Sequence, residues 1–176
     1  MLIAFLAFAT ACHAYADFDP PKIFPLAPYV TYKAGQSATF RCEGTQHGVT
    51  WLLPADASDS MKRRVTVVHT INRDFFAAIL NLRDLNFTDT GSLICAYNGT
   101  TDFTDIDNSS SIHLFVEDKR HLLKYSGFEF YQAVQSQTFI VPCMPTNPEV
   151  NVTLWKMGRQ VELDTYIKFD PKVSRP

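Results

Sequence analysis

Short stretches in which apolar and polar residues alternate recur between residues 38 and 116. In the first of them, Ala38, Phe40 and Cys42 alternate with the polar residues Thr39 and Arg41. A period of two places successive side chains on opposite faces of a strand, so that one face is buried and the other meets water. Strands of this kind are predicted at 38–42, 49–52, 64–70, 76–82, 91–97 and 111–116. Because no helical stripe of useful length accompanies them, the sequence predicts an all-β sandwich or barrel.

Two cysteines and a tryptophan narrow the choice of β fold. Cys42 and Cys95 fall on the inward faces of two separate predicted strands, and Trp51 follows nine residues after the first cysteine. In an immunoglobulin sandwich, two sheets about 10 Å apart are joined by one disulfide that packs against a buried tryptophan. The sequence therefore predicts an immunoglobulin-like domain over residues 17–118, with a Cys42–Cys95 disulfide and Trp51 in its core.

The corner before the second cysteine strand departs from the usual pattern of such domains. Asp89 and Gly91 are placed to shape this corner, but Leu93 occupies the position at which a tyrosine is usual. The hydroxyl bond from that tyrosine to the upstream backbone is then lost. We therefore expect this corner to be held by packing alone.

The cysteine-strand pattern begins a second time after the polar segment Glu117–Arg120. Phe128–Tyr131 resembles an entry strand, Gln137–Cys143 repeats the cysteine strand, and Val150–Trp155 repeats the strand that follows it. No second cysteine comes before the final residue, Pro176. The sequence thus predicts the N-terminal half of a second immunoglobulin-like domain over residues 119–176, in which Cys143 is unpaired and is either a free thiol or part of an intermolecular bridge.

The first 16 residues, MLIAFLAFATACHAYA, have the composition of an export signal. About ten nearly continuous apolar residues are followed by small residues, and Ala14-Tyr15-Ala16 fits a cleavage site. A buried strand and a lipoprotein-type Cys12 are the alternatives. Export permits disulfides and makes N-x-S/T triplets into glycan acceptors. The predicted glycosylation sites are Asn86, Asn98, Asn108 and Asn151.

Composition and motifs exclude several classes of function. The net charge of −2 and the isoelectric point of about 6.2 argue against nucleic-acid binding. After the N-terminus, no run of about 20 apolar residues predicts a membrane span. The five histidines show no metal-ligand spacing, and no nucleophile motif occurs, so we expect no enzyme activity, cofactor or metal.

Other chemistry-bearing residues are given ordinary surface roles. His69 and His113 fall at outward strand positions and are expected to be solvated, and Asp102, Asp105 and Asp107 are expected to form a solvated acidic loop. The cluster Lys62-Arg63-Arg64 is a weak candidate for binding polyanions.

Two segments of the second region carry a family resemblance. Val141–Leu154 reads VPCMPTNPEVNVTL, and Ile167–Lys172 reads IKFDPK. This pattern resembles the second immunoglobulin domain of the platelet-derived and vascular endothelial growth factor receptors. Phe40–Gly44, Val49–Trp51 and Asp89–Tyr97 are similar to the first domain of the same family. The resemblance implies an extracellular receptor ectodomain that binds a cystine-knot growth factor. It also implies that Leu154 is the core residue of its strand and that Trp155 points to the other face of that strand.

The sequence is compatible with three hypotheses about the function of the chain. The first is a secreted fragment of a growth-factor-receptor ectodomain that acts at most as a soluble decoy for a platelet-derived or vascular endothelial growth factor-type ligand. The second is an adhesion or interaction module that pairs with another immunoglobulin domain, and the third is a truncated product without independent function. Phe128, Phe130, Tyr131 and Trp155 are candidate partner-binding residues, because aromatic side chains anchor interfaces. Alternatively, these four residues line the core of the second domain.

Overall fold

The computed structural model describes residues 19–45, 48–54, 56–124, 143–163 and 168–170. The predicted export signal, and Phe128, Phe130 and Tyr131, lie outside these residues. Within residues 19–124 the strands are β1 Lys22–Phe24, β2 Tyr29–Lys33, β3 Ala38–Gly44, β4 Val49–Leu52, β5 Val65–Ile71, β6 Phe76–Leu82, β7 Gly91–Tyr97, β8 Ser109–Glu117 and β9 Leu123–Lys124. The helices are α1 Asp59–Arg64 and the 3-10 turn η1 Phe87–Asp89. Three further strands follow: β10 Met144–Pro145, β11 Leu154–Lys156 and β12 Arg159–Val161.

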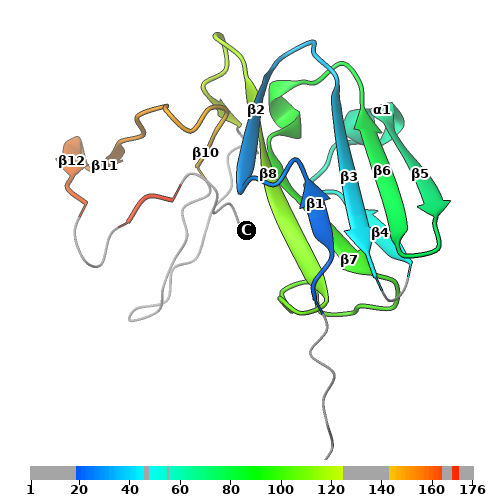
Figure 1. Ribbon diagram of the computed structural model, residues 1–176. Helices are drawn as coiled ribbons and strands as arrows, with labels where there is room; N and C mark the ends of the chain where they lie inside the picture. Colours follow the sequence, from blue (N-terminus) through cyan, green and yellow to red (C-terminus); the bar gives the residue numbers. More distant parts are fainter. Residues whose placement is uncertain (1–18, 46–47, 55, 125–142, 164–167, 171–176) are drawn as a thin grey trace, which may run out of the picture.

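The first eight strands form two layers that face each other (Figure 1). One sheet has the order β1-β3-β6-β5, and the other has the order β2-β8-β7-β4. All neighbours are antiparallel except β2, which runs parallel to β8. The predicted all-β sandwich is confirmed, and the predicted strands 49–52 and 91–97 coincide with β4 and β7.

The core lies between the two sheets and is built from the alternating apolar positions. On β3 and β6, Phe40 and Leu80 are register partners and both are fully buried. From the opposite sheet, Leu93 and Ile112 are partners on β7 and β8 and are also buried. Each such side chain contributes roughly 1.5–3 kcal/mol by leaving water. The period-two pattern therefore decided which face of each strand turns inward.

The helix α1 was not expected from the sequence. Its N-cap is Ser58, whose hydroxyl oxygen accepts a hydrogen bond from the backbone N–H of Met61 at 3.1 Å, and Lys62, Arg63 and Arg64 occupy its last turn. A capping serine at the start and cations near the end both stabilise a helix. Six residues are too few to produce a visible apolar stripe, and Met61 is the buried residue of the helix.

The second region differs from the prediction. The strand expected over Val150–Trp155 is limited to β11, Leu154–Lys156, which pairs with β12 through a two-residue turn. The turn residues Met157 and Gly158 both have positive φ, at 49° and 77°, as a type I′ hairpin requires. The strand expected over Gln137–Cys143 lies outside the described residues except for Cys143. In the part of the chain that the structure describes, no helix is long and apolar enough to cross a membrane.

Candidate functional site

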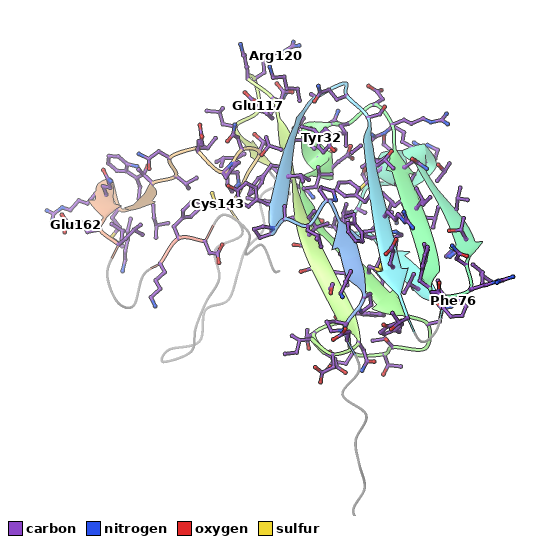
Figure 2. The ribbon with its side chains drawn as sticks, viewed as in Figure 1. Tyr32, Phe76, Glu117, Arg120, Cys143 and Glu162 are labelled. Atoms are coloured by element: carbon purple, nitrogen blue, oxygen red, sulfur yellow. A yellow bond between two sulfur atoms is a disulfide. The ribbon has the colours of Figure 1, made fainter. Side chains whose placement is uncertain are left out.

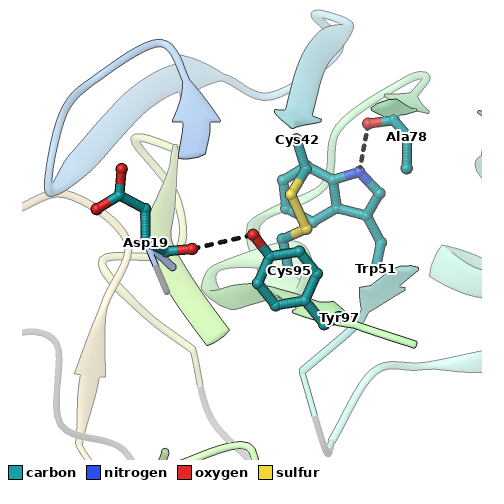
Figure 3. Close-up of a disulfide and its surroundings, with 6 residues drawn as sticks. All are labelled: Asp19, Cys42, Trp51, Ala78, Cys95 and Tyr97. Carbon is teal, nitrogen blue, oxygen red and sulfur yellow. Dashed lines mark hydrogen bonds between the residues drawn. A yellow bond between two sulfur atoms is a disulfide. The ribbon is translucent and has the colours of Figure 1, made fainter. Parts of the chain in front are cut away.

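A disulfide and a tryptophan join the two sheets at the centre of the sandwich (Figure 3). Cys42 on β3 and Cys95 on β7 are bonded, with 6.3 Å between their Cα atoms. Trp51 is the register partner of Cys95 and is only 8% exposed. Its indole N–H donates a 2.9 Å hydrogen bond to the backbone carbonyl of Ala78 on β6. Since a buried indole needs a partner for its N–H, this bond ties the second sheet to the first beside the disulfide.

A hydrogen bond from Tyr97 holds the first residue of the described chain, Asp19, against the same sandwich. Its hydroxyl donates a 2.9 Å hydrogen bond to the backbone carbonyl of Asp19, 78 residues earlier (Figure 3). The ring itself is buried at the end of β7. The segment that precedes β1 is therefore held against the sheet on which the second cysteine lies.

The corner at η1 is held by a buried ion pair, so the expectation of packing alone is wrong. Both terminal nitrogens of Arg64 donate to the carboxylate of Asp89, at 2.9 and 2.7 Å, and Asp89 is fully buried. Asp89 also accepts a 2.7 Å bond from the backbone N–H of Asn86. The hydrogen bond to Asp89 raises the pKa of Arg64, against the opposing effect of burial. Two-point binding of a carboxylate by arginine is the strong form of this contact, and here it holds the corner that precedes β7.

The same ion pair changes the interpretation of the cluster Lys62-Arg63-Arg64. Arg64 also donates to the backbone carbonyls of Arg83, at 3.0 Å, and Asp84, at 2.6 Å, so its guanidinium is used inside the fold. Lys62 pairs with Asp59 across one turn of α1 at 3.6 Å. A polyanion site built on three available cations is therefore contradicted.

A lysine connects the first sandwich to the segment that leaves it. The Lys124 side chain on β9 is almost completely buried, and its ammonium donates to the backbone carbonyl of Thr90 at 2.8 Å. It also pairs with Asp56 at 2.9 Å. Because both partners belong to the first sandwich, β9 is docked on the η1 end of that domain and is not a solvated linker.

Residues around β9 and β10 continue this docking. The ring of His121 stacks on Phe87 of η1 with 4.0 Å between ring centroids. The backbone N–H of Thr146 donates to Leu122 at 2.9 Å, and its hydroxyl donates to the carbonyl of His121 at 2.8 Å. Met144 and Thr146 are both buried. We refer to residues 121–124 and 144–146, with their partners on the first sandwich, as the junction.

The hairpin β11–β12 presents large apolar side chains to solvent (Figure 2). Trp155 is 61% exposed and Met157 is 96% exposed. Leu154, expected in a core, is 38% exposed, so the structure contradicts that expectation. The Trp155 indole N–H donates to the hydroxyl of Thr153 at 3.1 Å. The described part of the chain therefore leaves the predicted partner-binding residue Trp155 available for contact.

The predicted modification sites are accessible. All four sequon asparagines, Asn86, Asn98, Asn108 and Asn151, are exposed. Asn86 caps η1 with its side-chain oxygen, and the amide nitrogen of Asn108 donates to Asp105 at 2.7 Å. Cys143 is a free, half-buried cysteine, and burial raises the pKa of its thiol.

Two further expectations about polar residues have different outcomes. His113 is buried, not solvated, because it lies 4.5 Å from the ring of Phe115 and its Nδ1 lies 3.1 Å from the hydroxyl of Ser92. The acidic loop behaves as expected, since its carboxylates are used locally: Asp102 binds the N–H and hydroxyl of Thr104. Hydrogen bonds from Thr104 lower the pKa of Asp102, and the side chain of Asn108 lowers that of Asp105. Among the described residues, no group of three or more metal-ligating side chains forms.

Sequence reasoning missed the Arg64–Asp89 pair and the Lys124 contacts, because each joins residues at least 25 positions apart in the sequence. A cysteine pair with a tryptophan between them left a signal in the sequence, whereas a single lysine or arginine leaves none.

Comparison with known proteins identifies relatives of both regions. Residues 19–124 match the family model described as VEGFR1-3, N-terminal Ig-like domain. The chain is 27% identical over 144 residues to platelet-derived growth factor receptor alpha of Mus musculus, which covers 80% of this chain and 13% of the receptor. It is 30% identical over 130 residues to vascular endothelial growth factor receptor 1 of Mus musculus, which covers 70% of this chain and 10% of the receptor. The chain thus spans about a tenth of the length of these relatives.

The solved structures similar to this chain include a crystal structure of the Down syndrome cell adhesion molecule that contains its eight N-terminal immunoglobulin domains. It has a TM-score of 0.41 and 20% identity, and the match covers 56% of this chain and 14% of that one. Another is a complex of Dpr2 with DIP-Theta, with a TM-score of 0.39 and 23% identity, in which the match covers 56% of this chain and 34% of the other.

Proposed function

Because the chain belongs to the family of N-terminal immunoglobulin-like domains of vascular endothelial growth factor receptors 1 to 3, we propose that it is a secreted, non-enzymatic part of a growth-factor-receptor ectodomain. In this proposal the first domain spans residues 17–118, and the second begins at residue 119. The chain binds a cystine-knot growth factor of the platelet-derived or vascular endothelial type and acts as a soluble decoy.

The observation that carries the proposal is the exposed apolar surface of the β11–β12 hairpin. Trp155 and Met157 lie on its strand and its turn, and Leu163, 59% exposed, follows it. Aromatic and long aliphatic side chains anchor interfaces because they bury a large area at a small cost in entropy. The junction supports this function, since docking of β9 and β10 onto the first sandwich restricts how the second region can move.

Export and glycosylation are part of the same proposal. The apolar segment 1–16 and the exposure of all four sequon asparagines support them. Expression in a secreting eukaryotic cell should yield medium-borne protein whose mass falls after enzymatic removal of N-glycans. Changing each asparagine to glutamine, one at a time, should remove one mass step per used site. Protein retained inside the cell would contradict export, and a mass unchanged by deglycosylation would contradict glycosylation.

The test of ligand binding is biolayer interferometry of the glycosylated full chain against immobilised growth factors of the two types. We expect saturable binding at micromolar concentration or below. Trp155→Ala should weaken it at least about tenfold, because an anchor side chain contributes on the order of 2–4 kcal/mol. The matched control is Leu26→Ala, which removes another exposed apolar side chain, from the first domain.

Two results would contradict the proposal. Absence of binding at micromolar concentration would exclude the decoy, and equal losses from Trp155→Ala and Leu26→Ala would exclude the hairpin as the contact. In the first case the adhesion hypothesis would remain, since it requires contact with another immunoglobulin domain and no contact with a growth factor.

A further inference from the structure

The strand β5 is an uncovered edge of the first sandwich. It is the last strand of the sheet β1-β3-β6-β5, and Figure 1 shows it on the outer side of that sheet. Its seven residues read VTVVHTI, and residues 66–71 are all exposed. In the part of the chain that the structure describes, the backbone of β5 pairs only with β6. The outward N–H and C=O groups of β5 are therefore free to accept another strand.

The other three sheet edges of the sandwich are short and protected. The strand β1 has three residues and lies between Pro21 and Pro25, β2 has five residues and ends at Lys33, and β4 has four residues and is followed by Pro54. Proline, lysine and short length are the devices that prevent strands from pairing at an edge. Residues 65–71 contain no proline, glycine, lysine or carboxylate. The contrast marks β5 as the edge that is open to pairing.

We propose that a second copy of this chain pairs with β5 in antiparallel orientation, so that Val68 of one copy lies opposite Val68 of the other. The reason is that VTVVHTI is nearly the same read in either direction about Val68. In this register Val65 faces Ile71, Thr66 faces Thr70 and Val67 faces His69. Pairs of β-branched residues, and threonine pairs, are favourable neighbours across strands. Residues 65–71 contain no lysine, arginine or carboxylate, so none of these charges meet within the paired strands.

The register also preserves the faces of both sheets. In this register the residue numbers of each pair add up to 136. Because 136 is even, an inward-facing residue of one copy always lies opposite an inward-facing residue of the other, and the joined sheet keeps one inner and one outer face. Val67 and Ile71, which lie opposite the inward residues Leu80 and Phe76 of β6, extend the inner face. Val68, opposite Ile79 and 51% exposed, extends the outer one. A closed two-fold dimer results, with one continuous sheet of eight strands.

Glycans leave this edge accessible. The sequon asparagines Asn86, Asn98 and Asn108 lie at η1 and in the connection from β7 to β8, and Asn151 lies in the second region. None of them belongs to β5, to β6 or to the turn 72–75 that joins the two strands. The pairing uses only the first domain, so it is independent of ligand binding by the hairpin.

The test is sedimentation velocity of the glycosylated full chain over a hundredfold dilution series. We expect a monomer–dimer equilibrium with no larger species. Val68→Lys should raise the dimer dissociation constant at least about tenfold, because like charges directly opposite each other destabilise a strand pair. Val68→Glu should do the same, and a mixture of the two variants should form the dimer again. Thr31→Lys, on the exposed edge strand β2, is the matched control and should leave the dimer unchanged.

Cross-linking tests the register. In a Cys143→Ser background, oxidation by diamide should join two Val68→Cys copies. Two Thr66→Cys copies should stay separate, because their side chains lie four positions apart, about 13 Å along the strand. A chain that is monomeric at every concentration overturns the proposal, as does a dimer that is indifferent to Val68→Lys or an open-ended polymer. Cross-linking through Thr66→Cys rather than Val68→Cys overturns the register.

Discussion

Two nearly identical sequences in this chain have opposite structural outcomes. Val49–Leu52 reads VTWL in the first region, and residues 152–155 read VTLW in the second. In the first, Val49 and Trp51 are buried between two sheets, beside a disulfide. In the second, Leu154 and Trp155 are both exposed on a two-stranded hairpin. Alternation alone therefore does not bury a side chain, because burial also requires an opposing layer to pack against.

The exchange of leucine and tryptophan in these sequences changes which face the indole occupies. Successive residues of a strand point to opposite faces, so a shift of one position moves a side chain from one face to the other. Trp51 points inward and donates to Ala78 across the sandwich. Among the described residues, Trp155 bonds locally, to Thr153. The first tryptophan therefore stabilises the fold, and the second is available to a partner.

The largest expected effect separates the cysteines of the two regions. Replacing both Cys42 and Cys95 by alanine should lower the free energy of unfolding by about 4 kcal/mol, since the disulfide closes a long loop in the unfolded chain. Replacing Cys143 by alanine should change it by less than about 1 kcal/mol, since this cysteine is free. Urea denaturation followed by circular dichroism measures both. Equal losses would show that Cys143 is not a free thiol but is bridged to another chain.

The second largest effect on the free energy of unfolding is expected to distinguish the two tryptophans. Trp51→Leu should cost about 3 kcal/mol, because it opens a cavity in the core and leaves the Ala78 carbonyl without its donor. Trp155→Leu should change the free energy of unfolding by no more than about 0.5 kcal/mol, as is usual for an exposed residue. Urea titrations of the two variants give the comparison. A cost above about 2 kcal/mol for Trp155→Leu would show that the hairpin is part of a packed core.

A smaller effect is expected where the two regions meet. Lys124→Met removes the ammonium that binds Thr90 and Asp56, which should lower the stability of the junction by about 1.5 kcal/mol. Amide hydrogen exchange should then become faster in β9 and β10 and stay unchanged in β3 and β7. Lys33→Met, an exposed lysine on β2, is the matched control. If exchange in β9 were unaffected, the ion pair would not be what docks the junction.

The sequence predicted the first region better than the second for a physical reason. The strands β3, β4 and β7, the disulfide and the place of Trp51 all follow from a pattern repeated over adjacent residues. The Arg64–Asp89 pair and the Lys124 contacts depend on the final arrangement of distant segments, and single charged residues give no local sign of their partners. His113 was misassigned because its outward position on β8 was equated with exposure, although Phe115 and Ser92 lie against it.

The smallest expected effect concerns Asp118, which lies just before the junction and contacts His121. The N–H of Arg120 donates to its carboxylate at 2.8 Å, and His121 lies 3.0 Å from it. These contacts, the backbone bond first, lower the pKa of Asp118. A carboxylate with a lowered pKa in the folded state stabilises that state above its unfolded pKa, which is about 3.9, and loses this contribution as the pH falls through the folded value. Acidification below about pH 4 should therefore loosen the Asp118–His121 turn before the disulfide-bonded core responds.

Carbon-detected NMR titration of the Asp118 carboxyl group tests this. The midpoint should lie below the ordinary aspartate value, and His121→Ala should move it upward, because the variant removes one of the two hydrogen bonds. Asp102 is the internal control, since the pKa of that carboxyl is lowered by Thr104 in a different loop and should not respond to His121→Ala. A midpoint for Asp118 at or above the ordinary value would mean that the turn is not formed in solution. In that case Lys124 and the Phe87–His121 stack would still dock the junction on the first sandwich.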